Sequence, residues 1–331
     1  MRPFEYARPQ PEGEALDLLN DHDANTAVLA GGTDLVALLQ SDLQAPERVV
    51  DIKQIESMQG VTADEDGILI GALTTLEEIA ESPLLADYRS LGDVVSGVRA
   101  IQIQQMGTIG GDLCHLPNCW FYRNGYGLLA LENGESLVAD GDNRYHAIVG
   151  NQGPAKFVSA ARFAPALIAW GADVRVIGPD PNASEWLPLE HFFVTPKIES
   201  QGISVLKPGQ LISHVRLPAA ADRISSTYEV LQMDGLDWPL ATAAVTIDLD
   251  GSVVREASIV MGHVAPMPWA AHEAAQSLIG HAIDEVSATR AGELAVAGAT
   301  PLRDNAYKVQ LAKTAVKRAV LSAAEMLEGG L

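Results

Sequence analysis

The sequence predicts an α+β fold in two parts, a larger N-terminal part and a smaller C-terminal one. The chain has 331 residues, which is more than one hydrophobic core usually fills. Short strand-like runs and helices alternate without a repeat in the first two thirds, and three strand-like runs precede alanine-rich helices in the last third. Pro218, followed by small and charged residues over 219–223, separates the two parts. We therefore expect domains at 1–220 and 221–331.

Composition and charge restrict the class of protein. A formal net charge of −21 would repel the phosphate backbone of a nucleic acid. No apolar run reaches the roughly 20 residues needed to cross a bilayer, and the N-terminus lacks a basic segment followed by a hydrophobic stretch. Two cysteines are too few for a disulfide framework in a chain of this length. We expect a cytoplasmic protein with no nucleic-acid partner and no membrane insertion.

The first elements lead to a glycine turn. A strand over 26–29 runs into Gly31 and Gly32, and Thr33 and Asp34 then open an amphipathic helix. Residues without a β-carbon allow a ligand to approach the backbone closely, and a helix N-terminus favours phosphate. The turn is neither a Walker loop nor a Gly-x-Gly-x-x-Gly fingerprint, and such turns also serve chain geometry alone.

A second turn of the same kind follows at 106–114. It places Gly110 and Gly111 beside Thr108 and Asp112. Two turns able to hold phosphate in one chain suit a dinucleotide better than a mononucleotide.

Other elements of the first half follow from hydrophobic periodicity. Asp51 at a strand end could contact a ribose hydroxyl, although turn chemistry is the commoner role for such a residue. Thr74 and Thr75 precede early carboxylates, as at a helix N-terminus. We expect a helix over 11–22, strands over 48–52 and 67–73, and a longer helical stretch over 84–100.

The segment 112–127 concentrates two cysteines, a histidine and four aromatic residues. Cys114, His115 and Cys119, with His146 downstream, are ligand types that metals use. Adjacent ligands cannot easily face one ion, and no Cys-x-x-Cys pair is present. Burial of the thiols as small hydrophobic groups is therefore the favoured interpretation, and no metal ligand is assigned.

The second half continues with short elements and then changes character. Asp250 and Gly251 form a hairpin turn between two of the last strands. We expect a buried helix over 163–170, strands over 173–177, 211–218, 226–233, 241–249 and 253–263, and a final helix over 305–328.

Both glycine turns resemble those of a known protein family, and the resemblance extends over nearly the full chain. Residues 30–35 (Ala-Gly-Gly-Thr-Asp-Leu) and 107–114 (Gly-Thr-Ile-Gly-Gly-Asp-Leu-Cys) resemble the FAD-binding (medium) subunits of the xanthine dehydrogenase and carbon monoxide dehydrogenase family of molybdenum hydroxylases. The resemblance implies a two-lobed FAD-binding domain of the PCMH (vanillyl-alcohol-oxidase-like) type over 1–220, with lobes of about 1–55 and 56–220. An α+β domain with a three-stranded sheet and helices would follow at 221–331. Further matching blocks are 1–6, 143–158, 206–212, 262–269 and 301–308.

This family membership would also imply cofactors and partners. A large subunit would carry molybdopterin, a small subunit would carry two [2Fe–2S] clusters, and the complex would be a dimer of heterotrimers. Electrons would pass from the clusters to FAD in this chain and on to an external acceptor. Cys119 matches a position at which some relatives begin a [4Fe–4S] insertion, but the chain lacks three further cysteines, so we expect no such cluster here. A second departure is Asp112, where the family commonly has Asn or Ser; this places a direct side-chain contact with pyrophosphate in doubt.

The resemblance assigns a cofactor-binding set and no catalytic residue, as expected for electron transfer. Backbone N–H groups of the two turns would hold the FAD pyrophosphate, and the hydroxyls of Thr33 and Thr108 are further donors. The resemblance adds three residues to the cofactor-binding set because they lie in the matching family blocks: Lys156, Tyr307 and Lys308. The expected set is Ala30, Gly31, Gly32, Thr33, Asp34, Leu35, Thr108, Ile109, Gly110, Gly111, Asp112, Lys156, Tyr307 and Lys308.

Two alternative functions stay open. One is a stand-alone PCMH-type flavin oxidoreductase, which would need a substrate pocket with a proton donor. The other is a docking subunit of the same complex that has lost the flavin, for which Asp112 is the hint in the sequence.

Overall fold

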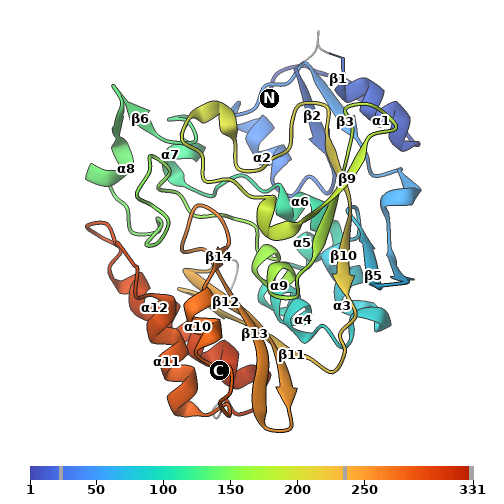
Figure 1. Ribbon diagram of the computed structural model, residues 1–331. Coiled ribbons are helices and arrows are strands. Elements are labelled where there is room, and N and C mark those ends of the chain that lie inside the picture. Colours follow the sequence, from blue (N-terminus) through green and yellow to red (C-terminus); the bar gives the residue numbers. More distant parts are fainter. Residues whose placement is uncertain (22–24, 234–236, 328–331) are drawn as a thin grey trace.

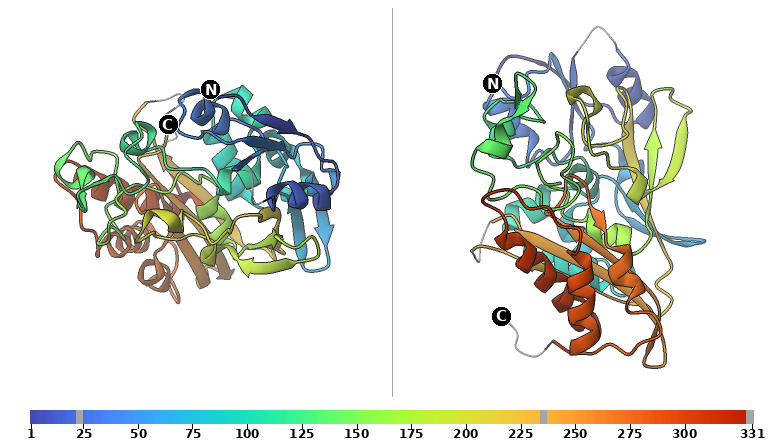
Figure 2. Two further views of the ribbon diagram at one scale, coloured as in Figure 1. Left: turned by 90° about the horizontal axis from the view of Figure 1, so that it is seen from above. Right: turned by 60° about the vertical axis from the view of Figure 1, so that its left-hand side comes forward.

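The computed structural model describes residues 1–21, 25–233 and 237–327. The expected ends of the first and last helices, His22 and Glu328, lie outside these residues. A first lobe and a C-terminal unit lie at opposite ends of the molecule with a second lobe between them (Figure 1; Figure 2, right). The predicted α+β class is confirmed.

The first lobe is a three-stranded parallel sheet in the order β1-β3-β2. Parallel neighbours need crossover connections, and the two helices of this lobe supply them. Since β2 is an edge strand, the glycine turn that follows it lies at an open side of the lobe. The elements are β1 (Glu5–Ala7), α1 (Glu12–Leu19), β2 (Thr26–Leu29), α2 (Leu35–Gln40) and β3 (Arg48–Asp51).

The second lobe is built on a five-stranded antiparallel sheet in the order β4-β5-β10-β8-β9. Ile70, Val174 and Val215 on its three central strands are fully buried, so the sheet covers the main core. The strands are β4 (Val61–Asp64), β5 (Gly67–Gly71), β8 (Asp173–Ile177), β9 (Ser184–Pro188) and β10 (Leu211–Pro218). The α-helices are α3 (Leu76–Glu81), α4 (Arg89–Gly97), α5 (Ile101–Met106), α6 (Ile109–Leu113) and α9 (Ala164–Ala169), and the 3-10 helices are η1 (Glu56–Met58), η2 (Pro83–Leu85), η3 (Leu189–His191) and η4 (Glu199–Gln201).

Two helix predictions for this lobe have different outcomes. Thr75 caps α3 in a capping box with Glu78, which confirms the predicted helix start. The expected helical stretch over 84–100 is largely helical but is divided, because η2, α4 and α5 are separate. Val98 and Ala100 have extended backbone between the last two, and this break lets 98–100 line a cavity.

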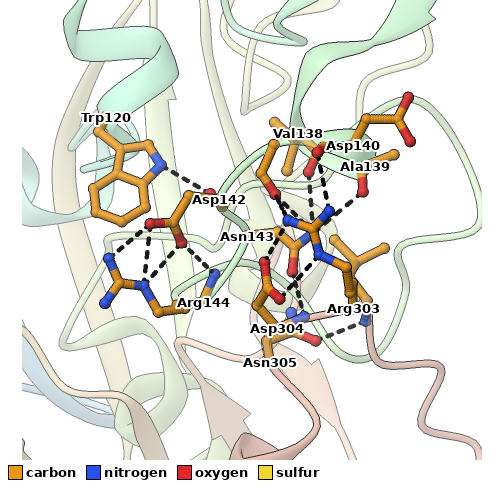
Figure 3. Close-up of polar contacts among 12 residues, drawn as sticks. Trp120, Val138, Ala139, Asp140, Asp142, Asn143, Arg144, Arg303, Asp304 and Asn305 are labelled. Atoms are coloured by element: carbon orange, nitrogen blue, oxygen red, sulfur yellow. Dashed lines mark hydrogen bonds and ion pairs between the residues drawn. The ribbon is translucent and has the colours of Figure 1, made fainter.

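A long irregular segment connects α6 to α9 and packs against the C-terminal unit. Its short elements are α7 (Trp120–Arg123), β6 (Leu131–Glu132), β7 (Glu135–Ser136) and α8 (Leu137–Asp140). The Asn143 side chain holds it in place: Nδ2 donates to the carbonyl of Val138, and Oδ1 accepts the backbone N–H of Asp304 at 2.8 Å (Figure 3). Arg303 donates to the carbonyls of Asp140 and Gly141 beside it.

The C-terminal unit is a four-stranded antiparallel sheet, β11-β12-β13-β14, with three helices on one face. The family pattern had predicted three strands; the short fourth strand pairs Trp269 with Met261. The final helix ends at Ala323, before the predicted end. The elements are β11 (Ile224–Val230), β12 (Ala241–Asp250), β13 (Val253–Gly262), β14 (Trp269–Ala270), α10 (His272–Gln276), α11 (Glu285–Ala295) and α12 (Tyr307–Ala323).

This sheet is buried on both faces. Along β12, Ala243 and Val245 face the helices of the unit, whereas Ala244 between them packs into the core of the second lobe. Such alternation follows from the two-residue period of a strand. Helices α4 and α9 cover the second face, where the Ser90 carbonyl accepts the Thr227 hydroxyl at 3.0 Å. The second lobe and the C-terminal unit therefore share an extensive interface.

None of the helices in the described ranges combines the length and the apolar character that a membrane span requires.

Candidate functional site

A cavity of about 670 Å³ follows the glycine turns. Both lobes contribute to it, and Trp238, just before β12, also lines it. A cavity of this size lies in the range that protein pockets use for small molecules and cofactors. The lining relevant to the site comprises residues 30–35, 98–100, Gly107, Thr108, Gly111, Asp112, Cys114, His115, Leu116, Arg162, Asp237 and Trp238.

The two glycine turns are in direct backbone contact. A β-carbon on Gly31 would lie 1.7 Å from the carbonyl oxygen of Met106 and 3.1 Å from the Gly107 α-carbon. The adjacent Gly32 has φ +75°, in the left-handed region that side chains rarely adopt. Glycine is thus required at both positions, and the two turns form one continuous wall.

The first turn presents a row of free backbone donors. Within the described part of the chain, the N–H groups of residues 31–35 have no hydrogen-bond acceptor, and all five residues line the cavity. We call these five donors the N–H nest. Because α2 has six residues, its dipole is small, and the N–H groups themselves supply most of the attraction for an anion.

Backbone N–H groups of the second turn are hydrogen-bonded to other protein groups. Ile109 N–H donates to the Thr74 carbonyl, Gly110 N–H to the Ala72 carbonyl at 2.8 Å, and Gly111 N–H to the Thr108 hydroxyl at 3.2 Å. Ile109 and Gly110 are buried and lie outside the cavity lining. The N–H groups of residues 109–111 are therefore not free for a ligand as expected, although Thr108 and Gly111 contribute to the cavity wall.

The Asp34 side chain pairs with an arginine and does not cap helix α2. Its carboxylate makes no cap hydrogen bond and instead forms a bidentate ion pair with Arg123, with Nη1–Oδ1 at 2.7 Å and Nη2–Oδ2 at 3.2 Å. His115 Nε2 lies 3.7 Å from the same carboxylate, but burial lowers the pKa of this histidine. Arg123 is therefore the cation that compensates Asp34.

Asp112 turns its carboxylate into the protein. Oδ1 accepts the Arg162 N–H at 3.0 Å, and Oδ2 accepts the Phe163 N–H at 2.9 Å. Burial raises the pKa of this carboxyl to about 6, and the two N–H donors limit the rise. The aspartate joins the second turn to the start of α9. This structural role accounts for an aspartate at position 112 without any contact to a ligand.

Arg162 and Glu229 form a buried ion pair at the cavity wall. Arg162 Nε lies 2.7 Å from Glu229 Oε1, the pair is bidentate, and the side chains are 10% and 7% exposed. The pair needs the space left by Gly97, where a β-carbon would lie 2.1 Å from Glu229 Oε2. Because Glu229 belongs to β11, this contact attaches the C-terminal unit to the site.

The predicted metal-ligand candidates separate into different environments. Cys119 Sγ lies 3.1 Å from His146 Nε2, and burial lowers the pKa of His146 to about 4. Cys114 is exposed to the cavity, so the interpretation that both thiols are buried is wrong for it. His115 faces Trp238, with ring centroids 4.9 Å apart. Among the residues described, no group of three metal-ligating side chains comes together.

Three residues of the expected cofactor set lie away from the cavity. Lys156 Nζ donates to the Asn151 carbonyl, and the Tyr307 hydroxyl donates to the Arg144 carbonyl at 3.0 Å. Lys308 is buried, and burial lowers the pKa of its amine to about 7. Its Nζ donates to the carbonyls of Tyr145, His146 and His263 at 3.2, 3.1 and 2.8 Å. These contacts join segments of the fold, and none of them places a donor in the cavity lining.

Sequence reasoning missed Arg123, Arg162 and Trp238. The first two bind carboxylates 89 and 67 residues away in the chain, which no local pattern reveals. An aromatic residue beside an acidic one, as in Asp237-Trp238, was the available signal for the third.

The residues present fit a dinucleotide. The N–H nest lines the cavity with its donors unpaired and so can receive an anionic group. The same lining includes the apolar side chains of Leu38, Leu43 and Pro46 as well as Arg162 and Trp238. Anion donors beside apolar and aromatic side chains match the diphosphate and the ring systems of a dinucleotide.

Comparison with known proteins agrees with this chemistry. Residues 2–220 match the family described as the FAD binding domain in molybdopterin dehydrogenase, and residues 226–323 match the CO dehydrogenase flavoprotein C-terminal domain. The chain is 26% identical to the carbon monoxide dehydrogenase medium chain of Hydrogenophaga pseudoflava, covering 97% of this chain and 96% of that protein. It is also 26% identical to the aldehyde oxidoreductase FAD-binding subunit PaoB of Escherichia coli K12, over 95% and 96% of the two chains.

The fold is similar as well. The solved carbon monoxide dehydrogenase from Hydrogenophaga pseudoflava that lacks the Mo-pyranopterin moiety of the molybdenum cofactor matches with a TM-score of 0.76 and 26% identity, covering 98% of this chain and 99% of the other. The resemblance seen in the glycine turns is confirmed, and the chain belongs to the family of FAD-binding medium subunits of molybdenum-containing oxidoreductases.

Proposed function

We propose that this chain binds FAD with its diphosphate at the N–H nest and transfers electrons within a multi-subunit molybdenum hydroxylase. The observation that carries the proposal is the row of unpaired N–H groups at residues 31–35, opposite the second turn and inside the cavity. Bound FAD supplies a group that accepts electrons singly or in pairs. The protein's part is to hold it through the nest and the Thr33 and Thr108 hydroxyls.

The partners follow from the family. We propose a large subunit with molybdopterin, a small subunit with two [2Fe–2S] clusters, and a dimer of heterotrimers in the cytoplasm. Electrons would reach the flavin from the clusters and leave to an external acceptor. We further propose residues 1–220, with lobes of about 1–55 and 56–220, as the FAD-binding domain and 221–331 as the C-terminal domain.

The alternative function, a docking subunit without flavin, is no longer supported by Asp112. The carboxylate that would repel a diphosphate is turned toward the backbone of Arg162 and Phe163 and is partly protonated near pH 6. An acidic residue at this position is thus compatible with a bound anion.

The test is a visible absorption spectrum of the purified chain, alone and copurified with its natural neighbours, followed by acid release and identification of the cofactor. One FAD per chain, with iron and molybdenum in the complex, supports electron transfer. Turnover of a substrate by the chain alone would favour the stand-alone oxidoreductase. A colourless chain that still assembles would contradict the flavin assignment and favour the docking role.

A further inference from the structure

The cysteine-rich and aromatic-rich segment 112–127 binds the Asp34 side chain of the first turn, chiefly through Arg123. Arg123, the last residue of α7, reaches back to Asp34, whose own N–H belongs to the nest. The guanidinium meets the carboxylate through two nitrogens, the planar geometry in which arginine binds carboxylates most strongly. The side chains of Arg123 and Asp34 are 19% and 21% exposed, so solvent screens the pair less than an ordinary surface ion pair.

The same guanidinium also fixes the wall of the cavity. Nε donates to the Pro117 carbonyl at 3.0 Å, and Nη2 donates to the Leu116 carbonyl at 3.0 Å. Leu116, His115 and Cys114 all line the cavity. Arg123 therefore connects two cavity-lining stretches that are far apart in the sequence, the first turn and residues 114–116.

The charge of Asp34 matters because of its position. A carboxylate beside a row of anion-binding N–H groups repels an anionic ligand unless a cation compensates it. Burial lowers the pKa of the nearby His115, so this imidazole is neutral at pH 7 and does not compensate the charge. Among the described residues, Arg123 remains as the cation paired with Asp34.

We propose that Arg123 is a positioning residue for the dinucleotide site, which neutralises Asp34 so that the diphosphate binds at the nest, while its carbonyl contacts hold the wall formed by residues 114–116. This inference rests on the proposed FAD function and assigns a role to segment 112–127 that cofactor binding by the two glycine turns does not provide. Neutralisation of Asp34 is the dominant effect, because the nest is complete without any atom of Arg123.

The test uses the full chain, freed of cofactor, and measures FAD affinity by flavin fluorescence. Arg123→Met leaves the carboxylate uncompensated and is expected to weaken FAD binding by about tenfold or more. Asp34→Asn is expected to bind FAD as well as the wild type or better. The double variant R123M/D34N is expected to regain most of the lost affinity. Arg123→Lys keeps the charge but loses the bidentate contact, so it should bind FAD more tightly than R123M.

Urea unfolding of each cofactor-free variant separates affinity from folding. Arg216 and Asp173 form a matched pair on β10 and β8, away from the cavity, with a nitrogen–oxygen distance of 2.7 Å. Arg216→Met should alter unfolding without altering FAD affinity.

Four outcomes would overturn the inference: R123M with wild-type affinity, a double variant as weak as R123M, R123K as weak as R123M, or D34N weaker than the wild type. A wild-type chain that binds no FAD would instead contradict the proposed function itself. If R123M does not fold, the comparison of D34N with the wild type still decides the matter, since a weakened D34N contradicts neutralisation.

Discussion

Gly31 and Met106 lie in backbone contact, so close that a β-carbon on the glycine would fall 1.7 Å from the methionine carbonyl oxygen. This contact joins the first lobe to the second and gives the cavity its continuous wall. It also explains why the glycine pair of the first turn is needed for the fold as well as for ligand approach.

Gly31→Ala is predicted to separate the two turns. The overlap is with backbone, which cannot rotate away as a side chain does, so we expect a loss of about 3 kcal/mol or more in the free energy of unfolding and loss of FAD binding. Urea unfolding and FAD titration measure both. Gly13→Ala in α1 is the matched control: nothing lies within 4 Å of its position, and it should raise stability by about 0.5–1 kcal/mol. Equal behaviour of the two variants would contradict the predicted contact.

Glu229→Gln is predicted to leave the Arg162 guanidinium buried without its counter-charge. Breaking one side of a buried ion pair costs about 3–5 kcal/mol, whereas replacing both partners with apolar residues is often close to neutral. R162M/E229M should therefore be more stable than E229Q alone. Chemical unfolding of the three proteins tests this, and an E229Q variant as stable as the wild type would show that the pair does not stabilise the interface.

The pH dependence of stability should carry a contribution from Asp112. Burial raises the pKa of its carboxyl from 3.8 to about 6, so the folded state binds more protons than the unfolded state between these values. Its contribution to stability is complete below the ordinary pKa and is lost as pH rises through about 6, a loss on the order of 2–3 kcal/mol by pH 7.

Asp112→Asn isolates this contribution. The amide satisfies only one of the two N–H donors, so the variant is less stable at acid pH, but its deficit relative to wild type should shrink as pH rises from 4.5 to 7. Urea unfolding of both cofactor-free proteins across that range gives the difference directly. A deficit that is constant with pH would contradict the raised pKa.

Lys308→Met is predicted to destabilise the chain without changing the FAD affinity of the folded protein. The carbonyls of Tyr145 and His263 would lose the Lys308 donor and that of His146 would keep only Asn305 Nδ2, at a cost of about 2–4 kcal/mol. Tyr307→Phe, which removes one exposed hydrogen bond, is the neighbouring control and should cost less than about 1 kcal/mol. FAD titration distinguishes this structural role from the role that the family block assigns to Lys308. Weakened FAD binding in a stable K308M protein would favour the latter.

Local patterns in the sequence were sufficient for the element types and for the two turns. Strand, glycine pair and helix start are set by residues within a few positions of one another, so the first turn and the capping box at Thr75 could be predicted. The predicted helical stretch is interrupted at 98–100, where Val98 and Ala100 are extended, Gln104 Nε2 donates to the Val98 carbonyl at 2.6 Å, and the segment lines the cavity.

By itself, the sequence determined the α+β class, the pair of glycine turns and the family. Only the tertiary structure decided which of the two similar turns keeps its backbone N–H groups free for a ligand. In the second turn, the N–H groups of Ile109 and Gly110 donate to the carbonyls of Thr74 and Ala72, whereas the N–H groups of residues 31–35 in the first turn remain unpaired. It also decided that Arg123 faces Asp34 and that Arg162 faces Glu229. Burial and charge compensation depend on which distant segments the topology brings together, and neither periodicity nor motif spacing contains that information.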